Sequence, residues 1–215
     1  MENVKRIDKL TLFEMIKYPD TYSGLAEGLI ELPVYGKLKI GKKLFSIPDT
    51  REELSERICY GQRLYLAREE INDFGIIIRI IGGYFYHGFY SLNNNDQKLT
   101  GIIKIIVNCL AKDIYPVALH IIKLMSELID NEQKMLYKAP SKIELAAGVE
   151  RLNVYAELNV LDFLRDAMKC TVLEVLETPY NECLVRLMNA KEIMDYQEKY
   201  QKLQMEEVEL KSKKR

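Results

Sequence analysis

The sequence predicts a mainly α-helical protein, a multi-helix, bundle-like domain that carries a small N-terminal β hairpin. Three observations predict this fold class. Apolar residues recur at spacings of three and four along most of the chain, helix-start signals precede several of these runs, and residues 29 to 47 change to apolar residues separated by lysines, with glycine and proline between them. The 215 residues, 48% of them hydrophobic, suffice for one ordinary domain or two small ones, and we expect one.

We expect three consecutive parts. Residues 1–50 should form an N-terminal arm with a short helix and the hairpin, residues 51–139 a central apolar helical core, and residues 140–215 a C-terminal helical module with a charged tail. In the arm, a capping box at Thr11 should start a helix that Pro19 stops within two turns. The hairpin should lie near residues 34 to 47.

The central part should supply most of the core. Its first helix begins after Pro48-Asp49-Thr50. The run from 75 to 90 is apolar nearly all round, but it is shorter than the roughly 20 residues that cross a bilayer and contains an arginine and a histidine. A buried helix is the first interpretation, and its isoleucines leave a strand as the alternative. Another apolar segment runs from 99 to 110, and Tyr115-Pro116 should begin a long amphipathic helix.

The third part carries the clearest helix-start signals. Capping boxes begin at Ser141 and Thr171, and Thr178-Pro179 should start a last helix that runs past residue 205. Apolar residues from 143 to 156 share one broad face, which we expect to be buried.

The tail from 197 to 215 is rich in Gln, Glu and Lys and should be an exposed helix or frayed. Ile193, Tyr196, Tyr200 and Leu203 follow a three-four-three spacing that suits a seam against a partner helix. They cover fewer than two heptads, so a solvated helix docked on its own domain is the alternative.

Composition excludes several classes of function. Lys and Arg total 31 against 32 Asp and Glu, so the net charge of −1 provides no field that favours nucleic acid or an anionic membrane. We expect no direct sequence-specific nucleic-acid binding and no membrane partner. Four widely separated cysteines form no zinc or redox motif, and the first residues lack the apolar core of a signal peptide, which favours a reduced, intracellular setting.

Candidate chemistry is sparse. The stretch from Gly36 to Lys43 reproduces the glycine and lysine spacing of a phosphate loop, but Lys43 replaces the hydroxyl that would hold magnesium and no helix can follow before Pro48. His87 and His120 have no carboxylate or cysteine at ligand spacing, and structural roles are expected for both. We therefore predict no catalytic residue, cofactor or metal, and a protein that is not an enzyme.

The candidate interface comes from the aromatic and apolar residues of the hairpin, the aromatic cluster and the last helix. The 14 tyrosines are scattered, and those between 84 and 90 are poor in neighbouring cations, so core packing or an assembly interface explains them better than base stacking. The expected interface residues are Tyr35, Leu38, Ile40, Tyr86, Tyr90, Tyr196, Tyr200 and Leu203.

A family resemblance spans most of the chain through short motifs. These are Thr11-Leu12-Phe13-Glu14-Met15-Ile16, Pro48-Asp49-Thr50 through Tyr60-Gly61-Gln62, Ala147-Gly148-Val149-Glu150-Arg151-Leu152, Val175-Leu176 and Pro179-Tyr180. In their order the chain resembles small helical proteins of tailed bacteriophages that infect gut Bacteroidetes, including crAss-like phages.

The resemblance implies a non-enzymatic virion structural protein, a subunit of a head–tail connector or tail ring. Such a protein would be made in the host cytoplasm and would contact its own copies and other virion proteins. The alternative is a soluble tail-assembly chaperone that is not retained in the virion. A small hydrolase or nucleotide-binding enzyme is a third class, and it would need a site that the sequence does not display.

Overall fold

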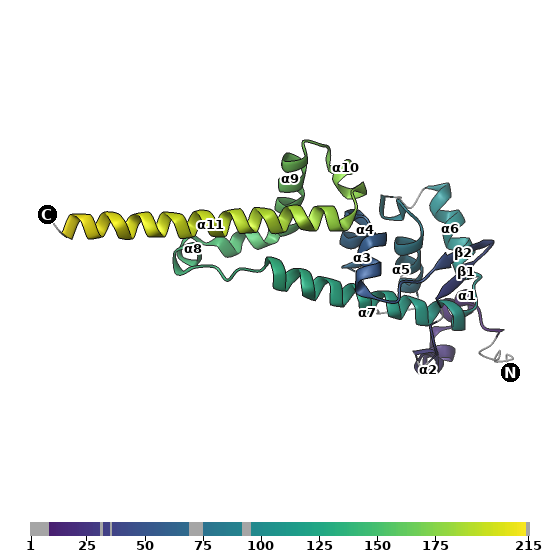
Figure 1. Ribbon diagram of the computed structural model, residues 1–215. Helices are drawn as coiled ribbons and strands as arrows, with labels where there is room; N and C mark the ends of the chain where they lie inside the picture. The colour runs from purple at the N-terminus through teal and green to yellow at the C-terminus, as the bar shows by residue number, and fades with distance from the viewer. Residues whose placement is uncertain (1–8, 31, 35, 69–74, 92–95, 214–215) are drawn as a thin grey trace. The chain divides into compact units, whose positions relative to one another are not determined.

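The computed structural model describes residues 9–30, 32–34, 36–68, 75–91 and 96–213, and these are mostly helical with one small antiparallel sheet (Figure 1). The predicted fold class is confirmed. The chain forms two compact units. Unit 1 comprises Met1–Asp130 and Leu176–Tyr180, and unit 2 comprises Asn131–Val175 and Asn181–Arg215. The first two predicted parts thus fall in unit 1 up to Asp130.

Unit 1 contains the N-terminal helices, the hairpin and the apolar helices. Its elements are α1 (Leu12–Lys17), α2 (Pro19–Ile30), β1 (Lys37–Ile40), β2 (Lys43–Ser46), α3 (Arg51–Arg57), α4 (Tyr60–Leu66), α5 (Gly75–Phe85), the 3₁₀ helix η2 (Phe89–Ser91), α6 (Gln97–Val107) and most of α7 (Ala111–Leu136).

Unit 2 begins within α7 and contains the remaining helices. These are α8 (Lys142–Ala147), the 3₁₀ helix η3 (Val149–Tyr155), α9 (Ala156–Met168), the first part of α10 (Val172–Glu177) and α11 (Tyr180–Lys213) after its first residue. The last helix therefore runs past residue 205, as predicted.

Local capping signals correctly located several helix starts. The Thr11 hydroxyl accepts from the Glu14 amide at 3.4 Å, and Ser141 accepts from the Glu144 amide at 3.2 Å. Thr50 caps α3 in the same way through the amide of Glu53. Each hydroxyl satisfies one of the amides that the first turn of a helix leaves unpaired.

Pro19 stops the first helix within two turns, as predicted. Pro19 is also the first residue of α2, a helix that the sequence analysis did not predict, and its missing N–H removes no intrahelical hydrogen bond at that position. A correction concerns α7, which begins at Ala111 and carries Pro116 inside it. The amide of Ala111 donates to the Leu10 carbonyl at 2.8 Å, and this contact fixes the chain before the proline.

The hairpin forms where the alternation predicted it. β1 and β2 pair antiparallel, with Leu38 opposite Phe45 and Ile40 opposite Lys43, and Gly41 has the positive φ of 59° that the tight turn requires. Leu38 and Ile40 face the core of unit 1. The stretch that matched the glycine and lysine spacing of a phosphate loop is therefore this hairpin.

Helix α5 lies in the core of unit 1, so the interpretation as a buried helix is confirmed for residues 75 to 85, after which the run continues as a turn and the 3₁₀ helix η2. Ile76, Ile77, Ile80 and Ile81 are all buried. The backbone also comes close to other side chains here, because a Cβ added at Gly82 would lie 2.5 Å from the Phe89 ring. Only glycine fits at that contact without a shift of the neighbouring ring.

Gln62 is the buried polar side chain of this core, at 3% exposure. Its amide nitrogen donates to the carbonyls of Gly83 at 2.8 Å and Tyr84 at 2.9 Å, and its oxygen accepts from the amide of Cys59 at 3.1 Å. Gly83 and Tyr84 lie in the last turn of α5, where the backbone carbonyls have no amide four residues later in the same helix to accept from. The side-chain amide of Gln62 donates to these two carbonyls instead. One side chain thus joins the start of α4 to the end of α5.

A backbone bridge holds the start of α11 in unit 1. The amide of Tyr60 donates to the Thr178 carbonyl at 2.9 Å, and the amide of Tyr180 donates to the Ile58 carbonyl at 3.0 Å. Tyr180 itself is 1% exposed. The helix that begins after Thr50 therefore ends before Ile58, where the chain becomes extended to make this pairing, and α4 follows as a separate helix.

The helix predicted across residues 143 to 156 is three shorter elements. Helix α8 ends after Ala147, because Gly148 takes a left-handed conformation with φ of 81° and its amide bonds back to Leu145. The chain continues as η3 and then α9. The apolar residues of this segment therefore do not form one continuous face.

Candidate protein–protein interface

Exposed hydrophobic side chains are concentrated in unit 2. Within the described ranges, all but four of the large hydrophobic residues that are exposed lie in this unit, and the exceptions are Phe13, Tyr18, Leu44 and Ile105. Unit 1 has instead a continuous buried core. Because large apolar side chains are usually buried unless they contact a partner, their accumulation on the surface of unit 2 makes this unit the candidate interface.

The first component of this interface is the α8–α9 surface, which we define as the exposed apolar residues from 143 to 158. Ile143 and Val154 are each 82% exposed. The prediction that this face is buried is wrong, because the turn at Gly148 and the 3₁₀ geometry of η3 interrupt the helical spacing that would have aligned its residues. The members are Ile143, Leu145, Leu152, Val154, Tyr155 and Leu158.

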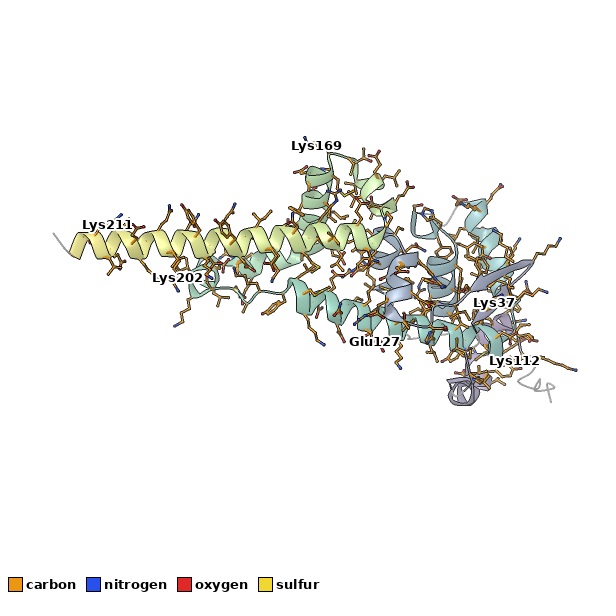
Figure 2. All side chains as sticks on the ribbon, viewed as in Figure 1. Lys37, Lys112, Glu127, Lys169, Lys202 and Lys211 are labelled. Carbon is orange, nitrogen blue, oxygen red and sulfur yellow. The ribbon has the colours of Figure 1, made fainter. Side chains whose placement is uncertain are left out.

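The second component lies along the C-terminal half of α11, the same part of the helix on which Lys202 and Lys211 lie (Figure 2). Tyr196 and Tyr200 stack there with ring centroids 6.2 Å apart and an interplanar angle of 16°. The side-chain amide of Gln204 donates to the Tyr200 hydroxyl at 3.0 Å. The aromatic side chains of this helix therefore contact one another and remain exposed.

A charged contact within unit 2 holds the opposite side of α11. The Lys138 ammonium donates to Asp195 Oδ1 at 2.8 Å and also to Glu198. These hydrogen bonds raise the pKa of Lys138 and lower the pKa of Asp195. The contact occupies charged side chains and none of the exposed apolar ones.

The structure places the sequence-predicted interface residues very differently. Leu38 and Ile40 are 3% and 1% exposed, so they belong to the core of unit 1 and are not accessible to another subunit. Tyr86 is half-buried and packs against Phe45 with ring centroids 5.6 Å apart. Tyr35 and the side chain of Tyr90 lie outside the described part of the chain.

Three predicted interface residues are exposed and lie together on α11. Tyr196 is 67%, Tyr200 51% and Leu203 55% exposed. Sequence reasoning identified these by their spacing but missed the α8–α9 surface, although Ile143 and Val154 stand in the printed sequence. Periodicity shows that apolar residues share a face, and it does not show whether that face meets a neighbour in the same chain.

The residues considered for chemistry have ordinary surroundings. His120 Nε2 lies 2.8 Å from the Pro48 carbonyl, which is a structural hydrogen bond, and His87 is exposed. Burial raises the pKa of the Cys109 thiol, which disfavours the thiolate form that a nucleophile needs. Over the described ranges, no group of three or more His, Cys, Asp or Glu residues is arranged to hold a metal ion.

Two surface hollows lie in the described part of the chain. One is lined by residues of α11 alone, so no second element encloses it. The other, of about 400 Å³, lies in unit 1 between the segment from 32 to 39 and the start of α7, and its lining includes Lys37, Lys112 and Asp113.

No helix in the part of the chain that is described is both long and apolar enough to span a bilayer.

Comparisons with known proteins gave no match to a family model, a curated protein or a solved structure. The candidate interface is therefore defined by the physical properties of this chain.

Proposed function

We propose that this chain is a non-enzymatic assembly protein that acts through protein–protein contacts of unit 2. On the motifs that resemble small helical phage proteins, we propose further that it is a virion structural protein, a subunit of a head–tail connector or tail ring. It would be made in the host cytoplasm and would contact its own copies and other virion proteins.

One observation supports the assembly role above the others, which is the exposure of the α8–α9 surface. Fully burying a single Ile or Val side chain contributes roughly 1.5 to 3 kcal/mol. Ile143 and Val154 are each 82% exposed, so they contribute little of this burial free energy in the isolated chain. A partner that covers the surface would recover that free energy, which is the usual reason for an apolar patch to be retained at an interface.

The runner-up is a soluble tail-assembly chaperone that is absent from the finished virion. The methionines of α11 favour it, because Met194 and Met205 are 66% and 71% exposed. Methionine is flexible and polarisable, and surfaces rich in it adapt to several different apolar partners.

Quantitative mass spectrometry of purified particles from the phage that encodes the chain tests the proposal. A structural subunit should be present at fixed stoichiometry. A double variant, Ile143→Glu with Val154→Glu, should lose incorporation while its thermal midpoint stays unchanged, because neither side chain contributes to a core. Lys142→Glu is the matched control, since it adds negative charge at the neighbouring exposed position and should incorporate normally.

The other outcomes separate the two candidates. A chain that binds a tail protein in the lysate but is missing from particles is a chaperone. A chain that is found in neither particles nor a complex with a tail protein contradicts both roles. If the double variant incorporates as well as the wild type, the α8–α9 surface is not the interface.

A further inference from the structure

We propose that a second copy of this chain pairs with α11 between Ile193 and Leu210 as a short antiparallel coiled coil. This inference deepens the proposed assembly role and rests on its premise that the chain works through protein–protein contacts. It uses residues that are separate from the α8–α9 surface, so the two proposals can fail independently.

Five exposed apolar residues of α11, one more than the spacing first suggested, lie on a heptad pattern, whereas the exposed Met194, Met205 and Val208 lie outside it. Six positions alternate by three and four residues and define the α11 seam: Ile193, Tyr196, Tyr200, Leu203, Glu207 and Leu210. Its five apolar members are between 48% and 67% exposed. A helix with such a stripe buries it when a second helix packs along the same line.

The opposite side of the helix is held within unit 2. Asp195 and Glu198, which bond to Lys138, stand at the outer positions of the heptad. At 100° per residue, the midpoint of these two carboxylate positions lies about 160° around the helix from the midpoint of Ile193 and Tyr196. The contact with Lys138 therefore leaves the seam free for a partner.

Glu207 decides the orientation of the second copy. In a parallel pair, like positions meet and Glu207 would face Glu207 of the second copy, which is unfavourable for two carboxylates at a packed position. In an antiparallel pair centred between Tyr200 and Leu203, those two residues pack on each other across the seam. Ile193 then meets Leu210, and Glu207 meets Tyr196, whose hydroxyl can donate to the carboxylate.

The charges that flank the seam also match the antiparallel order. Lys199 and Glu206 occupy the same flanking position in successive heptads. Antiparallel pairing places Lys199 of each copy beside Glu206 of the other copy, so two such pairs form, one on each side of the centre of the seam. Neither has a salt-bridge partner among the residues that the structure describes, whereas Glu207 is paired with Lys211 in its own helix. Parallel pairing would instead set Lys199 beside Gln204 and Glu206 beside Lys211.

The seam is short, and its size predicts a weak dimer. Eighteen residues of helix extend about 27 Å. If each of the ten apolar seam side chains in two copies loses about 100 Å² of exposed surface, the total is on the order of 1,000 Å², which is near the lower limit for a specific interface. We therefore expect a dissociation constant in the micromolar range and a monomer at low concentration.

Sedimentation velocity of the full-length protein over a wide concentration range tests the pairing, with charge exchange as the specific probe. Lys199→Glu alone and Glu206→Lys alone should each weaken dimerisation about tenfold, because each places two pairs of like charges across the seam. The double variant Lys199→Glu with Glu206→Lys should restore the wild-type affinity. Lys202→Glu and Glu209→Lys, on the outer side of the helix, make the same charge changes as controls and should leave dimerisation unchanged.

Each remaining outcome contradicts the proposal. A monomer at every concentration excludes the second copy as the occupant and leaves the seam to another protein. If the double variant Glu206→Lys with Lys211→Glu restores the wild-type affinity of dimerisation, and the double variant Lys199→Glu with Glu206→Lys does not, the two helices pair in parallel. If dimerisation is absent while the chain still enters particles at fixed stoichiometry, this inference fails and the proposed function stands.

Discussion

Replacing Gln62 by leucine tests the polar contact at the centre of unit 1. Leucine has a similar volume but neither donates nor accepts a hydrogen bond. The substitution therefore leaves the amide of Cys59 and the carbonyls of Gly83 and Tyr84 without the partner that Gln62 supplies, at a site that is 3% exposed.

The expected cost follows from the number of groups affected. A buried donor or acceptor that loses its partner costs about 1 to 3 kcal/mol, so three such groups cost roughly 3 to 9 kcal/mol together. Burial of the leucine side chain offsets about 1.5 to 3 kcal/mol of this. The net loss in the free energy of unfolding should be about 2 to 6 kcal/mol, which corresponds to a fall of roughly 4 to 24 °C in Tm for a chain of this size.

Urea unfolding followed by circular dichroism measures this loss, and thermal unfolding gives the change in Tm. Gln97→Leu is the matched control, because Gln97 is exposed at the start of α6 in the same unit. It should change the free energy of unfolding by less than about 0.5 kcal/mol. If Gln62→Leu is as stable as this control, the hydrogen bonds of Gln62 do not stabilise unit 1.

Two further predictions follow from close contacts. Gly82→Ala should destabilise the protein by about 1 to 2 kcal/mol, because the added Cβ would lie 2.5 Å from the buried ring of Phe89. Gly101→Ala is the control, because its Cβ would have no other atom within 4 Å, and it should stabilise α6 by about 0.5 to 1 kcal/mol. Equal changes in the free energy of unfolding, measured in urea, would contradict this prediction. The pKa of Asp195 is held below its ordinary value by Lys138, so the stabilisation from this contact should be present above the unfolded pKa and be lost as pH falls through the folded one. In Lys138→Ala, the pKa of Asp195 measured by carboxyl NMR should rise toward its ordinary value, and an unchanged pKa would show that another group lowers it.

The elements that sequence reasoning located correctly are those specified by neighbours in the chain. The capping boxes at Ser141 and Thr171 each need only a residue three positions later, and both form. The hairpin likewise depends on a local alternation and on one glycine turn. Such interactions are read directly from the printed sequence, because the partners lie within a few residues of each other.

The elements that it missed depend on partners far along the chain. The break at Ile58 arises from backbone hydrogen bonds with Thr178 and Tyr180, about 120 residues away, which leave no local signal. The contact of Lys138 with Asp195 is of the same kind. For the α8–α9 surface the difficulty is different, because an apolar stripe has the same spacing whether its partner is a helix of the same chain or another protein.

The symmetry of the two candidate contacts limits how they can be combined. Antiparallel pairing of α11 is isologous, with Lys199 of each copy meeting Glu206 of the other, so it closes at two chains and cannot by itself generate a ring. A ring needs a heterologous contact through a different surface, and the α8–α9 surface, with Ile143 and Val154, is an exposed apolar surface that is separate from the seam. A chain that uses both contacts therefore assembles in even numbers, as rings built from dimers or as two rings joined face to face. A chain that uses only α11 stays a dimer in solution.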